Sequence, residues 1–169
     1  MDTAILVLRL VVGLYLIGHG TQKLFGWFGG PGLDGTTGWL ESMRFRPARI
    51  WAVNAGLAEA GGGLLLALGF LNPIGSLMVA SAMLTAIFAV HLRKGWFSTT
   101  GGPELPLTNL AVVAAVALAG PGRYSLDTLL GLHIPAPIGI ALAVLTVIGV
   151  AFAFASRKPA AATARAEVA

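Results

Sequence analysis

The chain has 169 residues, of which 56% are hydrophobic and only 11% are charged, and its mean hydropathy is +0.83. An average soluble chain has about 25% charged residues, so these values and the long apolar runs indicate an integral membrane protein. The net charge of +4 does not indicate nucleic-acid binding, because the basic residues flank apolar spans instead of clustering on a soluble face. The absence of cysteine excludes disulfides, thiolate chemistry, iron–sulfur clusters and cysteine zinc sites within the chain.

Five apolar segments are each near the ~20 residues that cross ~30 Å of hydrocarbon. They predict an all-α fold, a polytopic membrane helix bundle. The fourth segment is the shortest, and the fifth has no ionisable residue. The predicted spans are residues 4–25, 51–71, 74–92, 105–120 and 135–155.

The first span carries basic residues that a lipid-facing helix would not tolerate. Arg9, His19 and Lys23 lie within or at the end of its apolar run, where a charge costs at least ~2.5–3.5 kcal/mol and usually faces the protein interior. At ~100° per residue, the three side chains fall within a wedge about 80° wide. We therefore expect this polar face of the first helix to have a partner on another helix.

The second span holds an acid that this polar face can meet. Glu59 lies among small residues, with Ala55 and Gly63 in the same row, and small residues let helices pack closely in lipid. His19 is nearer to Glu59 in depth. Arg9 lies roughly 11 Å away in depth but is the better partner for a carboxylate because its guanidinium is forked. Both pairings of Glu59 stay open.

Shorter segments between the spans are predicted to lie at the membrane surface. In the first linker, Trp39, Leu40 and Met43 share one side of a possible short helix, which predicts an interfacial segment, with a plain surface loop as the alternative. Segment 126–132 is too short to span and is also expected at the interface. The Ala-rich tail 157–169 is predicted to be disordered.

The basic residues outside the spans lie almost all on one side of this topology. Eight fall on that side and only Arg123 on the other. The positive-inside rule then predicts an N-terminus outside and a C-terminus in the cytoplasm. The eight are Arg44, Arg46, Arg49, Arg93, Lys94, Arg157, Lys158 and Arg165.

Four motifs in order resemble the DoxX family of small bacterial membrane proteins. They are H-G-x-x-K-L-F-G from His19, E-x-x-G-G from Glu59, V-H-L-x-x-G from Val90 and G-P-G-R-Y-S-L-D from Gly120. The resemblance covers roughly residues 5–127. It implies a four-helix bundle in the bacterial inner membrane, linked in parts of the family to quinone-dependent sulfur-compound oxidation and to oxidative-stress systems. It supplies no catalytic residue.

The resemblance also suggests a division of the chain. Residues 1–127 are expected to form the DoxX-like four-helix membrane domain. Residues 128–156 would add an interfacial segment and a further transmembrane helix, followed by the tail 157–169. The fifth span is a departure from the family pattern.

The polar residues of the spans suggest either a structural pair or a redox site. In the structural interpretation, an Arg9–Glu59 ion pair fixes how the first two helices dock. In the functional interpretation, a base and an acid exchange protons with a quinol, since histidine titrates near neutral pH. Haem and metal sites built on the histidines are weaker alternatives, so we expect no metal and no covalent cofactor. The candidates for a quinone or proton-relay site are His19, Lys23, Glu59 and His91.

Three functions follow from these interpretations. The first is a redox-associated membrane subunit, quinone-linked or acting in oxidative stress, that works with a soluble or membrane oxidoreductase partner supplying the electrons. The second is a small-molecule transporter or channel, which five spans without an inverted repeat disfavour. The third is a non-catalytic membrane scaffold. The lipid bilayer is the expected environment, and nucleic acid is not an expected partner. The sequence decides neither whether the chain is an enzyme nor its oligomeric state.

Overall fold

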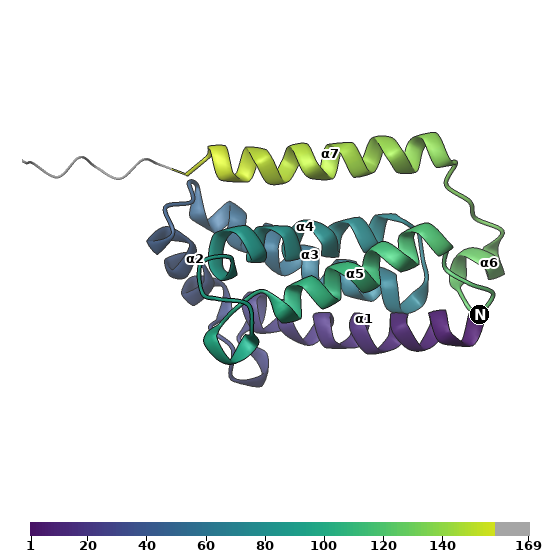
Figure 1. The fold of residues 1–169 in the computed structure, drawn as a ribbon, viewed down its shortest axis with the longest axis horizontal. Helices are drawn as coiled ribbons and strands as arrows, with labels where there is room; N and C mark the ends of the chain where they lie inside the picture. The colour runs from purple at the N-terminus through teal and green to yellow at the C-terminus, as the bar shows by residue number, and fades with distance from the viewer. Residues whose placement is uncertain (158–169) are drawn as a thin grey trace, which may run out of the picture.

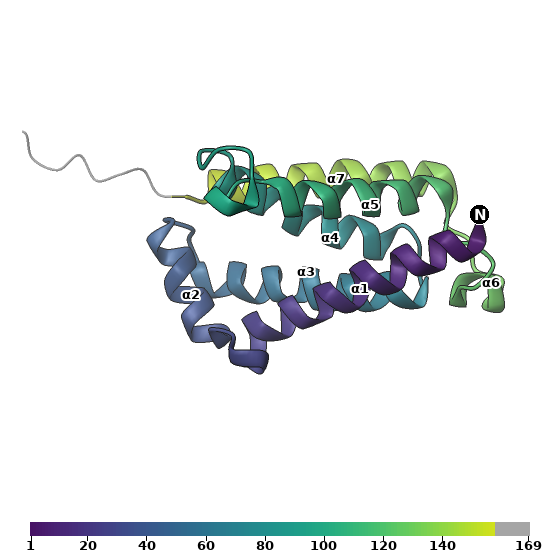
Figure 2. The same cartoon turned by 60° about the horizontal axis from the view of Figure 1, so that its bottom comes forward.

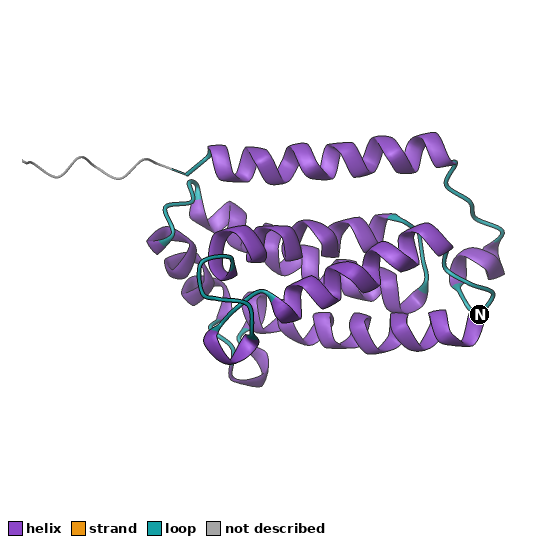
Figure 3. Ribbon diagram, in the orientation of Figure 1, coloured by secondary structure: helices purple, strands orange, loops and turns teal. Residues whose placement is uncertain are grey.

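The computed structural model describes residues 1–157, and each element in that range is a helix (Figure 1, Figure 3). Long helices run side by side, and short ones close the two ends of the bundle. This confirms the predicted all-α polytopic membrane bundle. The long helices are α1 (Asp2–Phe25), α3 (Ala48–Leu68), α4 (Ile74–Ala86), α5 (Glu104–Ala119) and α7 (Ala136–Ala155). The short elements are η1 (Trp27–Gly29), α2 (Gly32–Ser42), η2 (Ile87–His91), η3 (Ser98–Thr100) and α6 (Leu126–Leu130).

Four helical segments are long and apolar enough to cross a membrane. They are α1, α3, α7 and the segment Ile74–His91, in which α4 continues into the π-helical turn η2. The predicted fourth span corresponds to α5, whose 16 residues extend about 24 Å, less than a ~30 Å hydrocarbon core. Both predicted interfacial segments contain helices, α2 and α6, so the first linker is not a plain loop.

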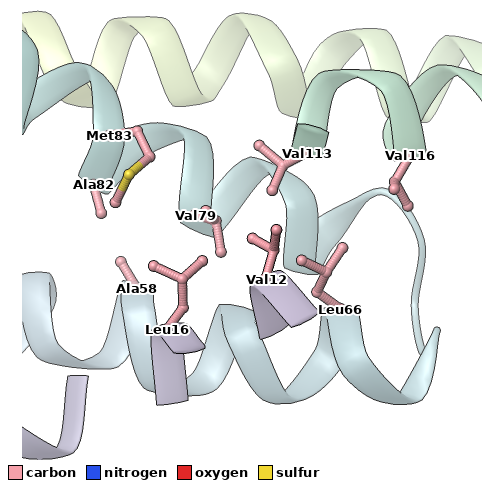
Figure 4. Close-up of a cluster of buried hydrophobic side chains, with 9 residues drawn as sticks. All are labelled: Val12, Leu16, Ala58, Leu66, Val79, Ala82, Met83, Val113 and Val116. Atoms are coloured by element: carbon pink, nitrogen blue, oxygen red, sulfur yellow. The ribbon is translucent and has the colours of Figure 1, made fainter. Parts of the chain in front are cut away.

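The long helices form two layers around one apolar core. Figure 2 shows α1 and α3 in one layer and α4, α5 and α7 in the other. Side chains of α1, α3, α4 and α5 meet between the layers, whereas α7 packs mainly against α4 (Figure 4). The core residues drawn there are Val12, Leu16, Ala58, Leu66, Val79, Ala82, Met83, Val113 and Val116.

The contact between α1 and α3 is the closest in the bundle because glycines line it. A Cβ atom added at Gly20 would lie 2.3 Å from the backbone nitrogen of Ala60 and 2.6 Å from the carbonyl oxygen of Gly56. Gly13 and Gly63 face each other in the same way, with an added Cβ 2.7 Å from the opposite carbonyl oxygen. Small residues let two helix backbones approach closely in lipid, and this contact sets the register of α1 against α3.

Replacing Gly20 with Ala is expected to destabilise the protein by at least about 1–3 kcal/mol, since backbone atoms of α3 cannot move aside for the methyl group. Gly18 is the matched control on the same helix, because an added Cβ there meets nothing within 4 Å. Gly18→Ala should be neutral or slightly stabilising, as Ala favours a helix over Gly. Thermal unfolding in detergent, followed by tryptophan fluorescence, tests this, and equal melting temperatures for the two variants would contradict the assigned helix contact.

The two ends of the bundle differ in charge. Loops 43–47 and 92–103 and the end of α7 lie at the end closed by α2, whereas the N-terminus and α6 lie at the opposite end (Figure 1). The topology predicted from the sequence assigns eight basic residues to one side of the membrane. Those that the structure describes therefore lie at the same end of the bundle. Which end faces the cytoplasm stays a prediction. Of the predicted disordered tail 157–169, the structure describes only Arg157. Lys158, Arg165 and the rest of the tail lie outside the described residues.

Candidate functional site at Glu59

The central polar contact of the bundle joins α1 to α3. Lys23 Nζ forms an ion pair with Glu59 Oε1, and the two side chains are 24% and 6% exposed. Lys23 stands in the last turn of α1, one turn beyond the Gly20 contact with α3. The close approach of the two helices at that glycine brings the lysine within reach of the carboxylate.

Within residues 1–157, one oxygen of the Glu59 carboxylate has a bonding partner and the other has none. Glu59 Oε2 is buried and has no hydrogen-bond partner among the described residues. A buried polar atom left unpaired costs about 1–3 kcal/mol, and more when it is charged. Native structures seldom keep such an atom without a reason, such as a bound water or ion or a catalytic role. The second oxygen is therefore the strongest indication of a functional site.

A cavity of about 100 Å³ lies beside Glu59 and is lined by residues of α2, α3, α4 and α7. Its wall is mostly apolar, with a few polar side chains, the composition typical of small-molecule sites. The π-helical turn η2 contributes Ala89 and Val90, and such turns occur frequently at functional sites. The polar residues of the lining are Lys23, Thr36, Asn54, Glu59, Ser81 and Thr85, and its aromatic residues are Trp39, Phe45 and Trp51.

His19 lies outside this cavity. It is exposed, and its ring packs on that of Tyr15 with 4.5 Å between the ring centroids. It lines a second hollow, of about 370 Å³, together with Lys23 and residues of α2. The Glu59–His19 pairing favoured by depth is thus replaced by Glu59–Lys23, because the longer lysine side chain spans the helix contact. Lys23 borders both hollows.

The predicted Arg9–Glu59 pair is wrong, because Arg9 binds carbonyl groups. Its side chain is 1% exposed. It donates hydrogen bonds to the oxygens of Leu66 and Ala67 at the end of α3 and of Tyr124, each at 3.0 Å, and also to that of Pro121. The last carbonyls of a helix lack a regular partner within it. Arg9 supplies a partner for Ala67 and a second one for Leu66, whose oxygen also accepts from the Gly69 N–H group. This residue is structural.

Gly69 makes the Arg9 arrangement possible. It ends α3 in the left-handed conformation, with φ of 61°, and an added Cβ would lie 2.5 Å from Arg9 Cζ. Beside it, the buried Asp127 accepts hydrogen bonds from the N–H groups of Leu71 at 2.7 Å and Asn72 at 2.8 Å. Arg9 and Asp127 therefore close the end of the bundle opposite α2.

His91 does not reach the Glu59 cavity either. Its Nδ1 is hydrogen-bonded with the carbonyl oxygen of Gly101 at 2.6 Å, which ties the end of η2 to the following loop. Across residues 1–157, no three His, Asp or Glu side chains come together closely enough to hold a metal ion. Of the four candidate site residues, the structure brings together Lys23 and Glu59, places His19 in the neighbouring hollow and separates His91.

Sequence reasoning missed two polar residues of α4 and the contribution of α7. Ser81 and Thr85 line the cavity one turn apart, and polar residues spaced by four within an apolar span were the signal that could have found them. Gly149, Val150 and Ala153 of α7 also line it. Nothing in their local sequence marks them.

The fold and the site together define a polytopic helical membrane protein with a buried lysine–glutamate pair beside a largely apolar cavity. The DoxX family model matches residues 4–92, just over half of the chain, and the chain belongs to the DoxX family. It is 30% identical over 132 residues to the inner membrane protein YqjF of Escherichia coli (strain K12), covering 76% of this chain and 93% of that protein. No solved structure matches the chain.

Proposed function

We propose that this DoxX protein is a multi-pass protein of the bacterial inner membrane, a redox-associated subunit that binds the head group of a quinol beside Glu59. The observation that carries the proposal is the buried, unpartnered Glu59 Oε2 at the wall of an apolar cavity. A quinol hydroxyl is a donor of the kind this oxygen lacks. The inner-membrane location is supported by the name of the related YqjF protein.

The cavity dimensions limit how a head group is held. A volume of about 100 Å³ is smaller than the ~150 Å³ apolar cavity in which benzene binds. A quinol ring would therefore enter only in part and keep its substituents toward the lipid. Lys23 would hold one oxygen of Glu59, and the other oxygen would accept the hydroxyl hydrogen bond.

Glu59 is placed to take up a proton at Oε2, and Lys23 steadies the carboxylate from the other side. The hollow lined by His19 borders the same lysine, which supports proton exchange between Glu59 and that surface. Reduction of a bound quinone to the quinol takes up two electrons and two protons. Glu59 would pass the protons to the ring oxygens one at a time and take up each new proton from the surface beside Lys23. The chain has no cysteine for thiol redox chemistry, so a soluble or membrane oxidoreductase partner would supply the electrons.

Binding of a reduced quinone analogue to the purified protein tests this function. Trp39 and Trp51 line the cavity, so saturable quenching of tryptophan fluorescence reports occupancy. Glu59→Gln replaces an acceptor oxygen with an N–H donor. The reduced analogue should then bind at least about tenfold more weakly, a loss of about 1.4 kcal/mol, whereas the oxidised analogue, which only accepts hydrogen bonds, should lose less.

Glu104→Gln serves as the control, because Glu104 is an exposed residue at the start of α5. It should bind both forms as the wild type does. Quenching that does not saturate in the wild type, or equal affinity of wild type and Glu59→Gln for the reduced analogue, overturns the proposal. The scaffold role would then take its place.

A further inference from the structure

The fifth long helix, α7, forms part of the wall around Glu59. Gly149, Val150 and Ala153 of α7 line the same cavity as Glu59. This helix lies beyond residues 4–92, which match the family model. α7 thus takes part in the site and does more than anchor the chain.

Side chains hold α7 in place at one end of the cavity. Phe154 packs against Phe45 and Phe88, with ring centroids 5.8 and 6.4 Å apart, and Arg157 Nε donates a hydrogen bond to the Met43 carbonyl oxygen at 3.0 Å. Because α7 packs mainly on α4, its contact with α3 depends on side chains. Phe152 of α7 meets Trp51 of α3, with 6.2 Å between ring centroids.

Exposed lining residues mark the mouth of the cavity. Asn54 of α3 and Gly149 of α7 are both exposed although they line it. Asn54 lies about one helical turn from Trp51, and Gly149 lies about one turn from Phe152. The contact between Trp51 and Phe152 joins α3 to α7 on the side nearer α2. A Cβ added at Gly149 meets nothing within 4 Å. The mouth therefore lies between α3 and α7, on the lateral, lipid-facing side of the bundle.

We infer that ligands reach Glu59 from the lipid phase through this lateral opening between α3 and α7, and that Gly149 sets the size of ring that can enter. The inference rests on the proposed function, because it concerns the quinol at Glu59. The buried acid at the bottom and the Asn54 amide at the mouth suit a lipid-soluble ring with polar groups at its edge. Gly149 lines the cavity and a Cβ there meets no neighbouring atom within 4 Å, so a side chain at this position has room beside the opening.

Gly149→Leu tests the size limit, because a Cβ at this position meets no atom within 4 Å and leucine favours a helix over glycine. We expect the affinity for a reduced two-ring naphthoquinone analogue to fall at least about tenfold, and that for a reduced single-ring analogue to fall less. Ala151→Leu is the matched control, because Ala151 is exposed on α7 and is not part of the cavity lining. It should bind both analogues like the wild type.

The outcomes separate the inference from the proposed function. If Glu59→Gln weakens binding of the reduced analogues and Gly149→Leu does not, the lateral opening is wrong and the Glu59 site stands. If neither variant changes binding, the proposed function itself fails. If Ala151→Leu weakens binding as much as Gly149→Leu, the effect is a general one of α7 and the size limit at Gly149 is wrong.

A second measurement does not depend on an enlarged side chain. The chain has no cysteine, so Gly149→Cys and Ala151→Cys each carry a single thiol. A fully substituted quinol, which does not react with thiols, should slow labelling of Gly149→Cys by a lipid-soluble maleimide at least severalfold and leave Ala151→Cys unchanged. Equal labelling rates of Gly149→Cys with and without the quinol would overturn the inference.

Discussion

Replacing Lys23 with Met is expected to lower the stability of the solubilised protein by about 3–5 kcal/mol, the cost of removing one partner of a buried ion pair. The change leaves Glu59, which is 4% exposed, with neither oxygen bound by a residue of the described part of the chain. Glu59→Gln should cost less, because the partly exposed Lys23 can turn toward the hollow that it shares with His19. Unfolding free energies or melting temperatures in detergent measure both effects.

The double variant Lys23→Met/Glu59→Gln makes this test specific. With both charges gone, no unpaired charge stays buried, so the double variant should recover much of the stability lost in Lys23→Met. Lys94→Met, at an exposed lysine in the loop after η2, is the control and should be nearly neutral. A loss for Lys23→Met no larger than that for Lys94→Met would show that the pair does not hold α1 on α3.

Arg9→Met should produce a loss at least as large, at the other end of the bundle. The variant removes the donors to four carbonyl oxygens, those of Leu66, Ala67, Pro121 and Tyr124. Leu66 keeps the hydrogen bond from the Gly69 N–H group. Each of the other three carbonyls left unpaired costs about 1–3 kcal/mol, so we expect a loss of at least about 3 kcal/mol. Thermal unfolding in detergent measures it.

Arg9→Lys should fall between Arg9→Met and the wild type, since lysine keeps the charge but has three donors on one atom instead of a planar fork. Arg123→Met is the control. Arg123 is exposed, and its guanidinium lies 5.3 Å from the centre of the Tyr124 ring. If Arg9→Met unfolds at the same temperature as Arg123→Met, the carbonyl cluster around Arg9 does not support the fold.

The helices themselves could be predicted because their signals are local. Apolar runs long enough to cross a bilayer appear where the structure has α1, α3, α4 and α7, and Gly69 follows the last residue of α3 in the left-handed conformation that ends many helices. The first linker was predicted to contain a short interfacial helix or to be a plain loop, and α2 shows that it contains a helix. Hydropathy and turn chemistry need no knowledge of neighbouring helices.

The partner of Glu59 could not be predicted in the same way. Arg9, His19 and Lys23 share one face of α1 when only the helical period is considered. The register of α1 against α3 decides among them, and the contact of Gly20 with Gly56 and Ala60 sets that register. It places Arg9 at the end of α3, leaves His19 exposed and brings Lys23 to Glu59.

The sequence by itself determined the membrane class, the helical segments and the family motifs, because each depends on residues close together in the chain. Only the tertiary structure decided that α7 walls the Glu59 cavity. That helix is apolar on every side, so its sequence indicates no buried face. Its packing on α4 turns Gly149 and Ala153 toward the cavity, and this packing leaves no periodic signal in the sequence of α7.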